Sequence, residues 1–140
     1  MGQLISPAPL FAAHLPIEVL ERDVGRLVTA TTFTDQHVNA VGAVHGGMIA
    51  AVLDVALAGG GSATGNAEDY GITLSITVNF VRPLSPGRTT CESVMVGGGR
   101  RTKFAEAKLR DGAGVLVATA SGTVQVIQRP SPDTGPLTAR

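Results

Sequence analysis

Residues 48 to 58 are apolar at every position except Asp54. A helix that is hydrophobic all round needs cover on every side, so this stretch predicts a helix in the centre of the core. The glycines at 59 to 61 are expected to end it, because glycine adopts the left-handed conformation that closes many helices. The pattern therefore predicts a single carboxylate inside an otherwise apolar helix.

Extended segments are predicted on both sides of this helix. Between residues 72 and 81 apolar and polar side chains alternate, which predicts a strand with one dry face formed by Ile72, Leu74, Ile76, Val78 and Phe80. The three glycines at 97–99 and the Asp111-Gly112 pair are typical of turns between strands. The expected strands are residues 17–23, 27–34, 72–81, 88–96, 102–110 and 115–127.

The order of these elements predicts the fold class. Two extended segments precede the helix and a meander of four strands follows it, which predicts an α+β fold with an antiparallel sheet wrapped around one helix. One sheet cannot enclose a helix that is apolar all round, so we expect a second copy of the chain to supply the missing cover. Residues 1–128 are expected to form a single domain. The tail at 129–140, which has three prolines and little to bury, is expected to be disordered.

Composition narrows the classes of partner and compartment. The 140 residues carry a formal net charge of zero with a pI near 6.8, so no electrostatic argument favours nucleic acid or an anionic membrane surface. No apolar run is long enough to span a bilayer, and residues 1–14 lack the charged and apolar regions of a signal peptide. The single cysteine, Cys91, excludes an internal disulfide and a cysteine metal cluster, and it is expected to be a small buried hydrophobe. We therefore expect a cytoplasmic protein that uses no metal.

The central helix also carries the candidate chemistry. A lone buried carboxylate is costly, so Asp54 is a candidate catalytic residue; the alternative is a structural aspartate satisfied by a backbone amide or an arginine. Gly46 and Gly47 stand where the first helical N–H groups lack intrahelical partners, so a carbonyl oxygen could approach them closely. Alternatively, these glycines only let the chain enter the helix tightly.

The spacing of these groups limits how they can cooperate. Eight residues separate Gly46 from Asp54, which is about 12 Å along a helix. A nucleophile must come within roughly 3 to 3.5 Å of its target. If the Gly46 amide holds a substrate carbonyl, the attacking Asp54 must therefore belong to another chain. This predicts an obligate homodimer with two antiparallel core helices and two shared sites.

The loop before the helix contains three further polar residues able to do chemistry. His37 is expected to be exposed to solvent, and Asn39 has a side-chain amide able to take part in chemistry. His45 immediately precedes the glycines, where it could cap the helix or take part in catalysis. The residue type alone leaves both roles for His45 open.

Taken together, these motifs resemble those of the hotdog-fold acyl-CoA thioesterases of the phenylacetic acid degradation type, in the 4-hydroxybenzoyl-CoA thioesterase superfamily. The similarity runs from about residue 17 to about residue 127. The residues that carry it are Asn39, Gly42, Ala43, Val44, His45, Gly46, Gly47, Asp54, Asn79, Phe80, Val81, Arg82, Pro83, Gly99 and Arg100. The resemblance implies hydrolysis of an acyl-CoA thioester, in which coenzyme A is part of the substrate and no cofactor is needed.

The resemblance also implies roles for single residues. Asp54 would be general base or nucleophile, the Gly46 amide would polarise the thioester carbonyl, and Asn39 would place the attacking water or the acid. Thr73 would assist, because it matches a serine or threonine that relatives carry on the strand after the helix. Ala58 stands where other relatives carry a hydroxyl, so that further role is absent or falls to Thr73. Some relatives have glutamate in the helix, and the shorter Asp54 favours a water-mediated route over direct attack.

Binding of coenzyme A is implied at the dimer surface, where relatives hold its nucleotide end near the positions of Arg82, Arg100 and Arg101; ordinary solvated charges are the alternative. A homotetramer is likewise implied only by the family. The candidate substrate-binding residues are Gly47, Arg82, Pro83, Gly99, Arg100 and Arg101.

Apart from the resemblance, the chemistry of these residues is also consistent with thioester hydrolysis. A thioester has weak resonance stabilisation and a good leaving group, so an oriented water, a base and an amide donor suffice. Two other functions remain open: a non-catalytic acyl-CoA-binding protein with the same fold, and an enoyl-CoA hydratase or dehydratase. The second would need a catalytic histidine paired with an acid, whereas His45 is joined directly to the glycine turn.

Overall fold

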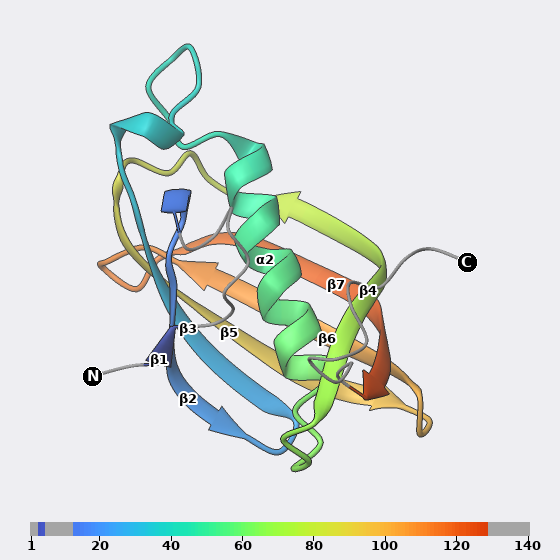
Figure 1. Ribbon diagram of the computed structural model, residues 1–140. Coiled ribbons are helices and arrows are strands. Elements are labelled where there is room, and N and C mark those ends of the chain that lie inside the picture. Colours follow the sequence, from blue (N-terminus) through green and yellow to red (C-terminus); the bar gives the residue numbers. More distant parts are fainter. Residues whose placement is uncertain (1–2, 5–12, 129–140) are drawn as a thin grey trace.

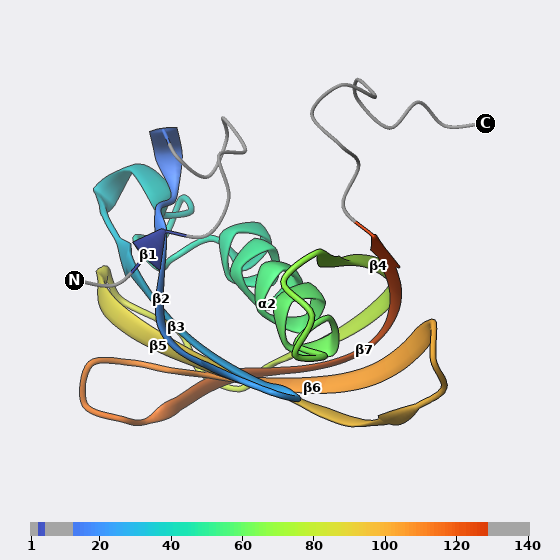
Figure 2. The ribbon, with the colours of Figure 1, turned by 60° about the horizontal axis from the view of Figure 1, so that its bottom comes forward.

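A long helix, α2 (Gly46–Gly61), lies in the concave face of a curved antiparallel sheet (Figure 1, Figure 2). The structure, a computed structural model, describes residues 3–4 and 13–128, so the expected tail at 129–140 lies outside the described residues. The other elements are β1 (Gln3–Leu4), β2 (Ile17–Asp23), β3 (Arg26–Phe33), the 3-10 helix η1 (Asp35–His37), β4 (Asp69–Phe80), β5 (Gly87–Gly98), β6 (Thr102–Arg110) and β7 (Leu116–Gln128). The predicted α+β class, with a sheet wrapped around one helix, is confirmed.

The strand order differs from the predicted four-stranded meander. The sheet runs β1-β2-β3-β5-β6-β7-β4, so only β5, β6 and β7 follow one another as a meander. β4 instead pairs with β7, from Asp69 opposite Gln128 to Phe80 opposite Ala118. Alternation along a strand reports which face is buried but not which strand lies alongside. Because β4 takes the far edge, the sheet curls around both flanks of α2 (Figure 2).

A β-bulge in β4 changes which side chains face the helix. Thr73 pairs with Val124, but Ser75 pairs with Thr123, so β4 carries one extra residue between them. Val124 is fully buried on the inner face, and its partner Thr73 points inward with it. The prediction of one dry face over 72–80 is therefore wrong before the bulge and holds only after it. The extra residue is what turns the Thr73 hydroxyl toward α2.

The helix continues through the glycines that were expected to end it. None of the three at 59–61 has a positive φ, and α2 runs to Gly61, where the Ser62 N–H donates to the Ala58 carbonyl at 3.0 Å. Their small size serves close packing instead. A Cβ on Gly60 would collide with Ser93 Oγ, and one on Gly61 would lie 3.0 Å from Val124. The residues of α2 buried against the sheet are Ile49, Val52, Leu53, Ala56, Leu57, Gly60 and Gly61.

The opposite side of α2 is not covered within one chain. Asp54, Val55, Ala58 and Gly59 are all partly exposed, although three of these four are apolar or small. All four line one cavity on the side of α2 between β2 and β4. Figure 2 shows that no strand of the sheet covers this side of the helix. This uncovered stripe supports the argument that a single sheet cannot enclose the helix. Cover by a second copy stays a prediction.

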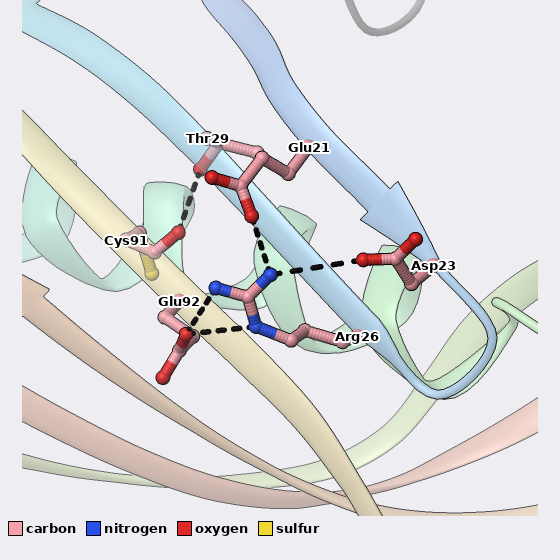
Figure 3. A network of polar contacts seen from close by, with 6 residues as sticks. All are labelled: Glu21, Asp23, Arg26, Thr29, Cys91 and Glu92. Carbon is pink, nitrogen blue, oxygen red and sulfur yellow. Dashed lines mark hydrogen bonds and ion pairs between the residues drawn. The ribbon is translucent and has the colours of Figure 1, made fainter.

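Charged side chains gather on the outer face of the sheet near the β2–β3 turn (Figure 3). Arg26 binds Glu21 at 2.5 Å and Glu92 at 2.7 Å, with Asp23 at 3.8 Å. The hydrogen bonds to Glu21 and then Glu92 raise the pKa of the Arg26 guanidinium. Exposed ion pairs of this kind contribute little to stability. They do show that the charge of Arg26 is already balanced by neighbouring carboxylates.

The expectation of a buried, unreactive Cys91 is confirmed. Its side chain is 1% exposed, and burial raises the pKa of the thiol to about 12, with the Glu92 carboxylate adding to the shift. At neutral pH the thiol is therefore protonated and a poor nucleophile.

Candidate active site

The start of α2 presents one free backbone donor. His45 caps the helix: its Nδ1 accepts a hydrogen bond from the Gly47 N–H at 2.9 Å. Of the two roles open for His45, the structure therefore shows capping. The Gly47 N–H is occupied by this bond, whereas the Gly46 N–H makes no hydrogen bond to any described residue. Gly46, rather than Gly47, is thus the donor available to a ligand.

An aromatic ring that sequence reasoning did not single out borders this donor. A Cβ on Gly46 would lie 3.3 Å from the Phe80 ring, and that ring is 56% exposed at the end of β4. The following loop is tied to the helix entrance, because the Val44 N–H donates to the Leu84 carbonyl at 2.8 Å. Two signals in the sequence pointed to Phe80, the period-two pattern that placed its ring on the inner face and its position in the motif that resembles the family, but neither placed it beside Gly46.

The side-chain oxygen and the backbone of Asn39 are hydrogen-bonded within the loop before α2. Its Oδ1 accepts hydrogen bonds from the Val41 N–H at 3.0 Å and the Ala43 N–H at 3.2 Å. The Asn39 N–H also donates to the Ala43 carbonyl at 2.7 Å. Only the side-chain NH2 group is left for a ligand, so a role in placing a reacting group would have to be as a donor.

The prediction that His37 is solvent-exposed is wrong. His37 is 8% exposed; its Nδ1 accepts from the Thr34 N–H at 2.9 Å and its Nε2 donates to the His14 carbonyl at 2.6 Å. The His37 carbonyl in turn accepts from the His45 N–H at 2.8 Å. Sequence reasoning missed this because the acceptor at His14 is distant in the chain. His37 belongs to the support of the helix cap.

Asp54 and Thr73 line one cavity on the open side of the fold. The cavity measures about 640 Å³ and lies between α2 and the edges formed by β2 and β4. Asp54 is partly exposed and makes no hydrogen bond or ion pair with any described residue. The structural alternative, a carboxylate satisfied by an amide or an arginine, therefore finds no partner in the described chain. Thr73 Oγ1 is buried and has no hydrogen-bond partner among the described residues either.

The donor and the carboxylate do not meet within one chain. Gly46 and Asp54 stand on the same unbroken helix, eight residues apart, which is about 12 Å along its axis. An oxygen bound at the Gly46 N–H is therefore out of reach of the Asp54 carboxylate of that same chain.

The three candidate arginines do not cluster within one chain. The Arg82 N–H donates to Val117 at one end of β7, and the Arg101 carbonyl accepts from Val126 toward the other end. Nine residues of strand separate those partners, roughly 30 Å along β7. Arg82 and Pro83 lie in the β4–β5 loop near the start of α2, while Gly99, Arg100 and Arg101 lie in the β5–β6 turn.

The β5–β6 connection is the hairpin turn that its glycines predicted. Gly98 has φ +118°, and the Gly99 N–H donates to the Thr102 carbonyl at 2.9 Å. Among the residues that the structure describes, no group of three His, Cys, Asp or Glu side chains could hold a metal ion. Within the same ranges, no helix is long and apolar enough to cross a membrane.

Comparison with known proteins identifies the class that this fold and site define. The sequence model of the thioesterase superfamily matches residues 41–118, which is more than half of the chain and includes α2. A mutant of the phenylacetic acid degradation protein PaaI from Thermus thermophilus is 31% identical, with a TM-score of 0.73 over 84% of this chain and 97% of that one.

Two less similar structures share the fold. PaaI from the phenylacetic acid degradation operon of E. coli is 22% identical, with a TM-score of 0.78 over 89% of this chain and 87% of that chain. A Streptococcus mutans UA159 protein solved with acetyl CoA is 22% identical, with a TM-score of 0.73 over 82% of this chain and 91% of that chain. This chain is a hotdog-fold protein of the PaaI type. It belongs to the thioesterase superfamily and is a thioester hydrolase.

Proposed function

We propose that the protein hydrolyses acyl-CoA thioesters to the free acid and coenzyme A, at two sites shared between the subunits of a homodimer. The observation that carries this proposal is the pair of groups on α2 without partners among the described residues, the Gly46 N–H and the Asp54 carboxylate. Their separation of about 12 Å requires that one site take its donor from one copy and its carboxylate from the other.

The reaction follows from what each group can do. The thioester carbonyl oxygen accepts a hydrogen bond from the Gly46 N–H, which stabilises the negative charge that develops there. Asp54 of the second copy takes a proton from water, and the water oxygen bonds to the carbonyl carbon. The carbon–sulfur bond then breaks, and the departing thiolate receives that proton. An auxiliary role for Thr73 is supported by its place in the lining of the same cavity as Asp54 and by its buried Oγ1, which has no hydrogen-bond partner among the described residues.

Two surfaces of the fold support the dimer. The uncovered stripe of α2 carries Asp54 with Val55 and Ala58, and an antiparallel second helix would bury it. β4 is an edge strand whose Leu74 is 56% exposed, which is unusual for an edge that faces water. A homotetramer and a cytoplasmic location are further proposals that rest on the family resemblance and on the sequence.

The dimer also accounts for the separated arginines. Arg82 of one copy would approach a site together with Arg100 and Arg101 of another, because one chain holds them at opposite ends of β7. Arg82 lies in the loop near the Gly46 donor, at the position expected for the coenzyme A end of the substrate. The structural relative solved with acetyl CoA supports a ligand of this class.

The direct test is a panel of acyl-CoA thioesters assayed for released thiol, with wild-type protein and Asp54→Asn compared. Asparagine keeps the volume of Asp54 and removes the base, so turnover should fall on the order of a hundredfold to ten-thousandfold while the melting temperature is retained. Near-normal turnover by a folded Asp54→Asn would refute the assignment of the base. Binding without turnover in the wild type would point instead to an acyl-CoA-binding protein. Hydration of enoyl-CoA would point to a hydratase, against which the occupied Nδ1 of His45 argues.

A further inference from the structure

One arginine faces the same cavity as Asp54 and has no partner among the described residues. Arg22 pairs across the sheet with Leu27, which is 1% exposed and points at α2, so Arg22 lies on the inner face of β2. It lines the 640 Å³ cavity together with Asp54. It makes no hydrogen bond or ion pair with any described residue. In contrast, Arg26 and Arg88 are paired with acids on the outer face (Figure 3 shows Arg26).

Neither of the two acids that line this cavity pairs with Arg22. Asp69 lines the same cavity, but its Oδ2 accepts from Thr64 Oγ1 at 2.5 Å and its Oδ1 accepts from Asn66 Nδ2 at 3.3 Å. Asp54 also lines the cavity, and it has no partner among the described residues. The Arg22 side chain is exposed, and its guanidinium has no hydrogen-bond or ion-pair partner among the described residues, beside a cavity whose walls are mainly apolar.

Packing holds the β2–β3 hairpin, which carries Arg22, against the second half of α2. Leu27, the cross-strand partner of Arg22, packs on Gly59, where an added Cβ would lie 2.5 Å from Leu27 Cδ2. Gly59 follows Asp54 by five residues, about 7.5 Å along the helix. The β2–β3 turn is held against the end of α2 by a 2.6 Å hydrogen bond from the Gly25 N–H to the Ala63 carbonyl. On the side of the sheet, the apolar lining of the cavity includes Ile17, Leu27 and Ile72.

We propose that Arg22 selects acyl groups that carry a carboxylate at the end remote from the thioester. This inference rests on the proposed function, since the reacting carbonyl must lie at Asp54. A carboxylate suits a guanidinium because two parallel charge-assisted hydrogen bonds form. An alkyl end offers the guanidinium no such hydrogen bonds.

The test compares two thioesters of equal chain length, adipoyl-CoA and hexanoyl-CoA, which differ only in the terminal carboxylate. Wild-type protein should have the larger kcat/KM for adipoyl-CoA. Arg22→Met keeps much of the length of the side chain and removes its charge, so it should lower the adipoyl-to-hexanoyl ratio on the order of tenfold to a hundredfold. Arg22→Lys should retain part of the preference. Arg88→Met, on the outer face, is the matched control and should leave the ratio unchanged.

A second pair of substrates separates the two possible sources of negative charge. Adipoyl and hexanoyl thioesters of N-acetylcysteamine carry no phosphate. If Arg22 binds the acyl carboxylate, the fall in the ratio persists with these short thioesters. Alternatively, Arg22→Met could lower kcat/KM equally for both CoA thioesters and leave both N-acetylcysteamine thioesters unaffected. That result would mean that Arg22 binds a phosphate of coenzyme A, and it would overturn the proposal. An unchanged ratio in folded Arg22→Met would overturn it as well.

Binding measurements keep this inference distinct from the proposed hydrolysis. Calorimetric dissociation constants for both CoA thioesters are measured with Asp54→Asn, and again after Arg22→Met is added. A lower preference for adipoyl-CoA in the double variant supports the role of Arg22 whether or not the wild type shows turnover. Equal affinities for the two thioesters in Asp54→Asn itself refute it. Absence of hydrolysis by the wild type, in contrast, contradicts the proposed function.

Discussion

The shared site makes a prediction that can be tested by mixing two inactive variants. Gly46→Pro removes the free N–H while fitting the first turn of a helix, where proline is tolerated. His45 has φ −61° and ψ 132°, an extended conformation that a following proline accepts. The Gly46 N–H makes no hydrogen bond to a described residue, so its removal breaks no hydrogen bond among the described residues. The second variant, Asp54→Ala, deletes the base.

The expected size of each effect follows from the group removed. Loss of one carbonyl donor costs about a hundredfold to a thousandfold in turnover, and loss of a base about a hundredfold to ten-thousandfold. Each variant homodimer should thus be nearly inactive. The added side chain of Gly46→Pro meets the Phe80 ring at 3.3 Å, so Gly46→Ala is the matched control. It adds the same Cβ, keeps the N–H, and should retain far more activity than the proline variant.

Mixing then distinguishes the two arrangements. Random exchange of equal amounts makes about half of the dimers mixed, and each mixed dimer has one site with both groups and one with neither. About a quarter of wild-type activity should therefore return, measured as thiol released from an acyl-CoA. If donor and base acted within one chain, every site would lack one group and nothing would return. Mixed dimers that are demonstrated by mass spectrometry and yet are inactive would refute the shared site.

Two further predictions concern charge. Arg82→Ala or Arg100→Ala should raise KM for an acyl-CoA and leave turnover of a short thioester without the nucleotide unchanged; equal effects on both substrates would make these arginines structural. Because the pKa of Cys91 is raised to about 12 in the folded chain, its stabilising contribution is complete below the ordinary thiol value of 9.0 and is lost as pH rises from there toward 12. Denaturant unfolding of the wild type should therefore show a fall in stability over this range that is smaller in Cys91→Ala, and identical slopes would contradict it.

The elements and the lone acid were predictable because they depend on local pattern. The apolar run around Asp54 is long enough to indicate a buried helix, and strand alternation is a short-range signal. The position of Thr73 was not predictable in the same way. Strict alternation places its hydroxyl on the polar face, and only the one-residue bulge opposite β7 brings it inward. Such a bulge depends on pairing between strands that are distant in sequence.

Long-range pairing also decides the other differences. The burial of His37 depends on the carbonyl of His14, which no local pattern reveals. The separation of Arg82 from Arg101 follows from β4 taking the edge beside β7. Arg22 stands out only once its strand is paired with β3, because exposed charges on β2 are otherwise indistinguishable by sequence.

The cap at the start of α2 has a consequence for how the two halves of the proposed site can evolve. The donor at Gly46 belongs to the main chain, so among ordinary substitutions at that position only proline deletes it. The base is one side chain, and a single codon change at Asp54 removes it. A lineage that loses Asp54 would keep the His45 cap and the Gly46 N–H, and with them the hydrogen-bond donor for a carbonyl oxygen. Hydrolysis is therefore detachable from ligand recognition, and one reversion at position 54 would restore it.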